Sequence, residues 1–221
     1  MTEPRIQLAC LDMAGTTVSD GGAVERAFDA ALDAMAVPVA DRVAMVSYVR
    51  DTMGMSKIDV FRALFVDEGR SHAANSAFED AYAQAIDEAE PVPGAAETIG
   101  ALRERGIRVA LTTGFSARTR DLLLDALGWH DVADVVLSPS DAGRGRPYPD
   151  MILTALIRTG TDAVQAVAVV GDTAADVTAG VRSGASVVVG VLSGADDEER
   201  LSTAGATAVV SSIVTVPALL V

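Results

Sequence analysis

The stretch Asp12-Met13-Ala14-Gly15-Thr16-Thr17 decides how this chain is interpreted. It follows residues 5–11, a nearly continuous apolar run that is typical of a strand buried on both faces of a parallel sheet. In an open α/β sheet, ligands bind in the crevice outside the carboxyl ends of the strands. Asp12 is therefore either a turn or cap residue or part of a binding site, and the rest of the chain has to decide between the two.

The composition limits the classes of protein to which the chain can belong. It has 221 residues, 50% of them hydrophobic, enough for one complete domain and a modest second one. The net charge of -14 argues against nucleic acid and against an anionic membrane as partners. The single cysteine, Cys10, excludes an internal disulfide and fits a reducing cytoplasm. No signal-peptide pattern and no membrane-length apolar run is seen, so we expect a cytoplasmic protein.

Helical patterns fill a long block after the first strand. We expect four helices here. The first covers residues 23–36, the second begins at a cap on Asp41, the third covers 56–69 with a cap at Ser56, and the fourth covers 73–89. A block of this length is too long for a loop. We therefore expect residues 20–92 to form a helical cap domain over the carboxyl edge of the sheet.

From residue 93 onward, strand and helix patterns alternate. The expected strands are 107–111, 135–137, 167–170, 187–191 and 208–211, and the expected helices are 95–105, 117–127, 149–158 and 174–182. Such alternation is typical of a parallel sheet covered on both faces. We expect residues 1–19 and 93–221 to form an α/β core domain with a Rossmann-like parallel sheet.

Polar features follow the ends of four expected strands. Asp12 follows the first, Thr113-Gly114 the second, Arg146 lies in the loop after the third, and Asp172 follows the next. Because the carboxyl ends of parallel strands meet at one edge, we expect these groups to converge. Two carboxylates would repel each other there unless a cation lies between them. Mg²⁺ suits Asp12, Asp172 and a backbone carbonyl, for which we take that of Ala14.

Phosphoryl transfer is the chemistry that fits these groups. Asp12 would be the nucleophile, and Thr113-Gly114 with the Arg146 guanidinium would hold phosphate-like oxygens. Asp176, one helical turn past Asp172, would support the metal. Taken singly, each feature also fits a turn, a solvated loop residue or a helix cap. Their joint occurrence, in order and each at a strand end, favours a site.

These motifs resemble those of the haloacid dehalogenase superfamily of aspartyl-nucleophile phosphotransferases. The usual first motif there is Asp-x-Asp, whose second Asp is the general acid for the leaving alcohol, and here Ala14 replaces it. The form Asp-x-Ala-Gly-Thr-Thr is similar to that of the phosphonatase branch, the phosphonoacetaldehyde hydrolases, which cleave a carbon–phosphorus bond. Residues 145–149, Gly-Arg-Pro-Tyr-Pro, and residues 171–176 also resemble that branch. The resemblance implies a hydrolase of phosphonate metabolism with an inserted cap and Mg²⁺.

A segment of the cap block, residues 50–59, resembles the phosphonatase segment that carries a Schiff-base lysine. Lys57 falls on that position and is the only lysine in the chain. Arginine cannot form an imine in water, whereas lysine can. The resemblance thus implies catalytic roles for Asp12, Lys57 and Arg146. The residues that it places around the substrate and its phosphate are Gly15, Thr16, Arg50, Met53, Thr113 and Gly114.

An imine on Lys57 would make the missing acid unnecessary. The iminium would act as an electron sink, so that carbon leaves as an enamine while Asp12 attacks phosphorus, and water would then hydrolyse the aspartyl phosphate. Lys57 must be unprotonated to attack, and an ordinary lysine pKa of about 10.4 leaves about one molecule in a thousand or fewer ready at neutral pH. We expect burial under the cap, or nearby Arg146, to lower that pKa.

Three polar positions of phosphonatases are changed in this chain. The histidine three residues after the lysine is Val60, the tyrosine after Thr-Thr-Gly is Phe115, and the cysteine after the nucleophile loop is Gly22. All three groups could shuttle protons during imine formation and breakdown. We therefore expect a phosphonatase-like hydrolase that acts on phosphonoacetaldehyde or a related phosphonate, with the proton-transfer set altered.

Other hypotheses remain open at this point. A Mg²⁺-dependent phosphomonoesterase of the phosphoglycolate or sugar-phosphate type would act on a phosphate ester, but Ala14 removes its leaving-group acid. A non-catalytic phospho-acceptor module, like a receiver domain, would not need the long cap. An inactive relative that only binds would not need Asp12, Lys57, Arg146 and Asp172. The resemblance also implies a homodimer through the cap, for which the apolar face of residues 23–36 is either the interface or internal core.

Overall fold

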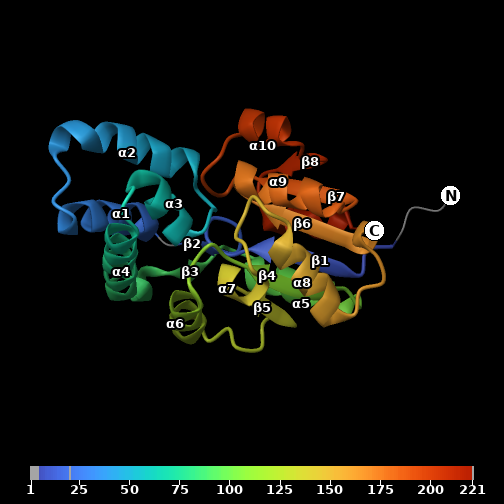
Figure 1. Ribbon diagram of the computed structural model, residues 1–221. Coiled ribbons are helices and arrows are strands. Elements are labelled where there is room, and N and C mark those ends of the chain that lie inside the picture. The colour runs from blue at the N-terminus through green and yellow to red at the C-terminus, as the bar shows by residue number, and fades with distance from the viewer. Residues whose placement is uncertain (1–4, 20, 221) are drawn as a thin grey trace.

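The computed structural model describes residues 5–19 and 21–220, and a six-stranded parallel sheet forms its centre. The strand order is β5-β4-β1-β6-β7-β8 (Figure 1). The strands are β1 (Leu8–Asp12), β4 (Arg108–Thr112), β5 (Val135–Leu137), β6 (Val167–Gly171), β7 (Val187–Val191) and β8 (Ala208–Val210). β1 lies between β4 and β6, with Asp12 opposite Thr112. This Rossmann-like α/β sheet confirms the predicted fold class.

Helices cover both faces of the sheet, which explains why the strand sequences are apolar throughout. Alternate residues of a strand point to opposite faces. Leu11 and Leu111 belong to the cluster that includes Ile99, whereas Leu8 and Ala110 pack on the other face. The helices of this part are α5 (Ala95–Glu104), α6 (Ala117–Leu127), α7 (Pro139–Ala142), α8 (Asp150–Thr159), α9 (Ala174–Ser183) and α10 (Glu198–Ala204), with 3₁₀ turns at Val164–Ala166 and Ile213–Ala218.

A separate group of helices lies beside the sheet (Figure 1). It consists of α1 (Ala23–Ala34), α2 (Val39–Asp51), α3 (Lys57–Leu64) and α4 (Glu68–Gln84), followed by a 3₁₀ turn at Ile86–Glu88. The chain enters and leaves this group through two short antiparallel strands, β2 (Val18–Ser19) and β3 (Glu90–Pro91). We propose that this group is the cap domain. Its expected first residue, Asp20, lies outside the described residues.

Two of the predicted cap helices have different limits in the structure. α3 ends at Leu64 rather than Gly69, because Phe65 is extended, and α4 begins at Glu68 rather than at residue 73. The Asp67 side chain accepts a hydrogen bond from the backbone N–H of Arg70 and so caps α4 five residues early. α2 begins after Pro38, so Asp41 is not its cap.

The short helices α7 and α10 were not expected from the sequence. α10 nevertheless carries a readable signal, because Asp197 caps it and two glutamates follow in the first turn.

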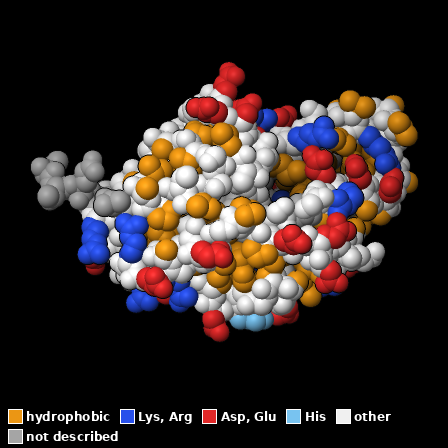
Figure 2. All heavy atoms as spheres, turned by 180° about the vertical axis from the view of Figure 1, so that it is seen from behind, with side chains coloured by type: hydrophobic (Ala, Val, Ile, Leu, Met, Phe, Trp, Pro, Cys, Tyr) orange, Lys and Arg blue, Asp and Glu red, His pale blue; other side chains and the backbone are white. Residues whose placement is uncertain are grey.

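The surface bears on the expected partners. On the face shown in Figure 2, acidic and basic side chains are interspersed, and a hollow lies where the smaller lobe meets the larger one. In the described part of the chain, we find no helix with both the length and the apolar character needed to cross a bilayer.

The apolar face of α1, including Phe28 and Leu32, is buried within the chain in a cluster that it shares with α4. Internal packing thus accounts for the face that suggested a dimer interface.

Candidate active site

The carboxyl ends of four strands meet at one pocket, as the parallel topology requires. Asp12 ends β1, Thr113 follows β4, Asp172 follows β6, and residues 193–195 come shortly after β7. Cap residues on the other side close a cavity of about 280 Å³. The residues lining it from the sheet side are Asp12, Ala14, Gly15, Thr113, Gly114, Phe115, Arg146, Asp172, Thr173, Ser193, Gly194 and Ala195; those from the cap side and its entry segment are Ser19, Gly21, Gly22, Val24, Glu25, Met53, Gly54 and Lys57.

Three buried carboxylates form the floor of this site. Asp12, Asp172 and Asp176 each offer an oxygen, and these oxygens lie within 4.8 Å of one another. Each side chain is almost fully buried. Burial raises the pKa of Asp12 and of Asp176 to about 7, although Arg146 partly opposes the shift. Burial, together with the nearby Asp176 charge, raises the pKa of Asp172 to about 6. The three acids are therefore costly to keep ionised without a further cation.

Arg146 holds two of these acids in place. Its Nη2 lies 2.7 Å from Asp12 Oδ1, and its Nη1 lies 2.8 Å from Asp176 Oδ1. The same guanidinium donates hydrogen bonds to Thr112 Oγ1 and to the carbonyl oxygen of Gly54, both at 3.2 Å. With only 4% of its surface exposed, Arg146 is fixed by the sheet on one side and by the cap on the other. It can orient the Asp12 carboxylate while it carries positive charge into the pocket.

The floor fits a hard divalent cation. Three carboxylates against one guanidinium leave a net negative charge when all three are ionised, and all the donors are oxygens, as Mg²⁺ prefers. Asp172 is oriented by Thr16, whose Oγ1 donates to Oδ1 at 2.9 Å, and by the backbone N–H of Ala195, which donates to Oδ2 at 2.9 Å. Both oxygens of Asp176 are occupied by Arg146 and Thr173, which suits a supporting role rather than a direct one.

Glycines allow the loops to approach Asp172 closely. A Cβ added at Gly15 would lie 2.3 Å from Asp172 Oδ2, and one added at Gly194 would lie 1.9 Å from the same atom. Neither contact is possible for a real side chain. The loops after β1 and β7 therefore form a cradle around this carboxylate that only glycine permits at these two positions.

The cap contributes Lys57 to the same pocket. Lys57 is the first residue of α3, is 8% exposed, and donates its backbone N–H to the carbonyl oxygen of Gly114 at 3.3 Å. Its Nζ lies 3.5 Å from the carbonyl oxygen of Met55. The segment before it sits tightly on the sheet side, since a Cβ at Gly54 would lie 2.3 Å from Thr173 Oγ1. The amine and the Asp12 carboxylate thus line one cavity although they come from opposite sides of it.

Most of the residues singled out from the sequence come together here. Those that line the pocket are Asp12, Ala14, Gly15, Met53, Lys57, Thr113, Gly114, Arg146 and Asp172. Thr16 and Asp176 lie behind it, in contact with Asp172 and with Arg146 respectively. Arg50 is not brought to the pocket: its side chain is 64% exposed, with Nε 3.2 Å from Glu25 Oε1. Of the three altered positions, Gly22 and Phe115 line the pocket, and Val60 is buried.

Some residues of the site were not singled out from the sequence. Residues 193–195 hold Asp172 and also the loop after β1, because Ala195 N–H donates to Asp172 Oδ2 and Ser193 Oγ donates to the carbonyl oxygen of Gly15 at 2.7 Å. Their position just after an expected strand was a usable signal, since that strand ends at the same edge of the sheet. Glu25 lines the pocket from α1, and no pattern in the sequence indicates this.

Comparisons with known proteins agree with this geometry. Residues 6–184 match the family model described as haloacid dehalogenase-like hydrolase. A phosphonoacetaldehyde hydrolase from Parabacteroides distasonis is 30% identical over 154 residues, which are 61% of this chain and 58% of that relative. One from Bacillus cereus is 28% identical over 214 residues, covering 87% of this chain and 78% of that relative. A probable phosphatase, IndB of Dickeya dadantii, is 29% identical over 203 residues, covering 89% and 86%.

Solved structures share the whole fold. A hydrolase from Pseudomonas syringae superposes with a TM-score of 0.85 at 25% identity, covering 96% of this chain and 97% of that one. A phosphonoacetaldehyde hydrolase-like protein from Oleispira antarctica also gives a TM-score of 0.85, at 22% identity, covering 99% and 92%. The second likeness bears on the fold alone.

Proposed function

The chain belongs to the haloacid dehalogenase-like hydrolase family, and from this premise we propose that it is a Mg²⁺-dependent, phosphonatase-like hydrolase. It cleaves the carbon–phosphorus bond of phosphonoacetaldehyde or of a related phosphonate. One observation carries the proposal: Lys57 and Asp12 line the same cavity, while Ala14 stands where a leaving-group acid would be needed for an ester. Relatives named phosphonoacetaldehyde hydrolase support the same substrate class.

At phosphorus, Asp12 is the nucleophile. Arg146 orients its carboxylate from Oδ1, and Thr113 with the amide of Gly114 accommodates the phosphoryl oxygens. Asp12, Asp172 and the Ala14 carbonyl would hold Mg²⁺, which would supply positive charge against the phosphoryl oxygens. Once the carbon–phosphorus bond has broken, water hydrolyses the aspartyl phosphate and releases phosphate from Asp12.

At carbon, Lys57 makes the leaving group. Its amine takes up a proton and condenses with the aldehyde to give an iminium and water. When the carbon–phosphorus bond breaks, its electron pair forms a carbon–carbon double bond and the carbon–nitrogen π pair moves to nitrogen. Carbon leaves as an enamine and needs no proton at that step. The reaction therefore does not need the general acid that is absent at Ala14. The small cavity, about 280 Å³, suits a substrate of a few heavy atoms. Glu25 and Met53 line the same cavity, and Arg50 pairs with Glu25 outside it.

A second candidate function is a Mg²⁺-dependent phosphomonoesterase. The observation that favours it is the loss of polar groups at Gly22, Val60 and Phe115, together with a relative named as a probable phosphatase. Ala14 speaks against it. A phospho-acceptor module without turnover is less favoured, because a cavity lined by both Asp12 and Lys57 suits an organic substrate.

We also propose the organisation that goes with this activity. Residues 1–19 and 93–221 form the core, and residues 20–92 form the cap. A small organophosphonate or phosphate ester is the partner, in keeping with the net charge of -14, which disfavours nucleic acid. The lone, buried Cys10 is in keeping with a cytoplasmic location.

Phosphate release from a panel of substrates with Mg²⁺ tests the proposal. The panel contains phosphonoacetaldehyde, phosphoglycolate, a sugar phosphate and acetyl phosphate, whose good leaving group needs no acid. Cleavage of phosphonoacetaldehyde by the parent but not by Lys57→Ala supports a carbon–phosphorus hydrolase. Hydrolysis of esters alone, undiminished in Lys57→Ala, would establish the phosphomonoesterase instead. Phosphorylation of Asp12 by acetyl phosphate without turnover would point to the acceptor module.

A further inference from the structure

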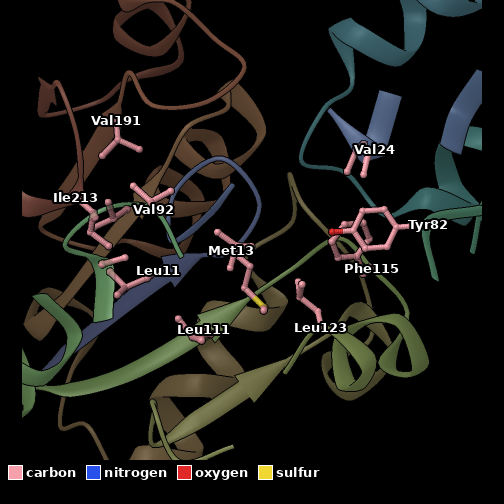
Figure 3. Packing of buried hydrophobic residues seen from close by; sticks show 14 of the residues in the cluster. Leu11, Met13, Val24, Tyr82, Val92, Leu111, Phe115, Leu123, Val191 and Ile213 are labelled. Atoms are coloured by element: carbon pink, nitrogen blue, oxygen red, sulfur yellow. The ribbon is translucent and has the colours of Figure 1, made fainter. Parts of the chain in front are cut away.

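Six of the nine aromatic residues of this chain form one cluster of rings beside its only lysine. Aromatic residues make up 4% of the chain, yet all five phenylalanines lie in one connected cluster of rings with Tyr82. The cluster joins Phe28, Phe61, Phe65, Phe78, Tyr82 and Phe115. Tyr82 and Phe115 pack closely, with centroids 4.7 Å apart (Figure 3).

Two of these rings face the lysine amine from different parts of the fold. Nζ of Lys57 lies 5.8 Å from the ring centroid of Phe28, on cap helix α1, and 5.3 Å from that of Phe115, in the loop after β4. Both distances are within the range of cation–π interactions. The two rings therefore form a clamp, here called the aromatic clamp, with one side on the cap and the other on the core.

We propose that Phe28 and Phe115 are positioning residues that hold the Lys57 nitrogen while it is cationic and so maintain its iminium. The proposal deepens the proposed function and rests on it. Ring faces attract cations and do not exchange protons with them. The clamp therefore stabilises a cationic nitrogen by electrostatics at a site where the side chains at positions 22, 60 and 115 offer no acid or base.

The charge balance of the reaction agrees with a clamp for a cation. The Lys57 ammonium and an aldehyde give an iminium and water, so the nitrogen carries one positive charge before and after condensation. When the carbon–phosphorus bond breaks, its electron pair becomes the carbon–carbon double bond of a neutral enamine. Water then protonates the enamine carbon, and hydrolysis of the resulting iminium restores the ammonium and releases acetaldehyde. The nitrogen is thus cationic in both iminium stages and in the ammonium that begins and ends the cycle, and neutral in the attacking amine and in the enamine.

Reductive trapping measures the iminium directly. Acetaldehyde, the expected product, is added with cyanoborohydride, which transfers hydride to the iminium carbon and leaves an N-ethyl group on Lys57. Because Lys57 is the only lysine, Lys57→Arg corrects for labelling of the terminal amine. Phe115→Leu and Phe28→Leu are each expected to slow trapping about tenfold, as loss of a desolvated cation–π contact implies. Phe115→Tyr keeps the ring face and is expected to restore most of the rate.

Phe65→Leu is the matched control. It removes a ring of the same cluster, one that stacks on Phe61 and lies under the Arg70 guanidinium. The control is expected to trap at the parent rate. Equal trapping in Phe115→Leu and the parent would overturn the clamp, as would an equal loss in Phe65→Leu, which would indicate packing alone. Absence of trapping in the parent would overturn the imine itself and with it the clamp, an outcome distinct from failure of the clamp alone.

Discussion

The two sides of the cavity are built by opposite physical means. The side that we assign to phosphorus is polar: it has three buried carboxylates and one guanidinium at the carboxyl edge of the sheet. The side that we assign to carbon carries Lys57, whose Nζ lies 5.8 and 5.3 Å from the ring centroids of Phe28 and Phe115, and its charged residues are Lys57 and Glu25. The difference teaches that one cavity can combine fixed ions, which suit negative charge, with ring faces, which suit positive charge. Each prediction below alters one side and asks whether the other side still works.

Asp12→Asn should have the largest effect, because it removes the nucleophile that every phosphorus substrate needs. Phosphate release from phosphonoacetaldehyde and from acetyl phosphate should fall together, by on the order of 10⁵-fold or more. Trapping of Lys57 by acetaldehyde and cyanoborohydride should continue, since the carbon side is intact. Loss of trapping in this variant would mean that the two sides are not separable.

Lys57→Arg should break only the carbon side. Arginine keeps a positive charge between Phe28 and Phe115 but cannot form an imine. Release of phosphate from phosphonoacetaldehyde should fall by about 10³-fold or more, whereas acetyl phosphate should still be hydrolysed, because its leaving group needs no assistance. Parallel assays of both substrates measure the separation. Substantial cleavage of phosphonoacetaldehyde by Lys57→Arg would show that charge, and not covalent chemistry, is what Lys57 supplies.

The polar side could be predicted from the sequence far better than the carbon side. Asp12, Thr113 and Asp172 each follow a recognisable strand, and topology alone then brings them together. The position of Phe28 over Lys57 depends on how α1 packs beside α3 and α4, and no periodicity fixes that contact. α4 begins at Glu68 rather than at residue 73 because the Asp67 side chain caps it, a polar signal that apolar spacing alone does not contain.

Gly194→Ala should damage the metal site without touching the reacting groups. Its Cβ would lie 1.9 Å from Asp172 Oδ2, so the loop after β7 or the carboxylate must move. Mg²⁺ affinity, measured by calorimetry, should weaken by about 10- to 100-fold, as for loss of a group that orients a ligand. Gly100→Ala is the control, because that helical position has open space around it and should leave affinity unchanged. Equal affinity in both variants would show that the cradle around Asp172 is not needed.

The smallest effect concerns the stability of the metal-free protein as pH changes. Burial raises the pKa of Asp12 and Asp176 to about 7 and of Asp172 to about 6, from an ordinary value of 3.8. The folded chain therefore keeps these protons at a pH where the unfolded chain has lost them. Between about pH 4 and 7, the free energy of unfolding should fall as pH rises. Mg²⁺ binds the ionised carboxylates, so it should restore more stability at pH 7.5 than at pH 5.5.

Thermal unfolding at these two pH values, in chelator and in Mg²⁺, measures this effect. In chelator the midpoint should drop by on the order of 5 °C from pH 5.5 to 7.5. Repulsion among the acidic groups of a chain with net charge -14 also grows with pH and lowers the midpoint. Two variants separate this cause from the titration of the three buried carboxyls. Asp176→Asn should flatten the slope, whereas Asp29→Asn, at an exposed position on α1, should not. Two results would contradict this prediction. One is an unfolding midpoint that rises with pH in chelator, and the other is an increase in midpoint on adding Mg²⁺ that is equal at both pH values. Either would mean that protons and Mg²⁺ do not compete for the three buried carboxylates.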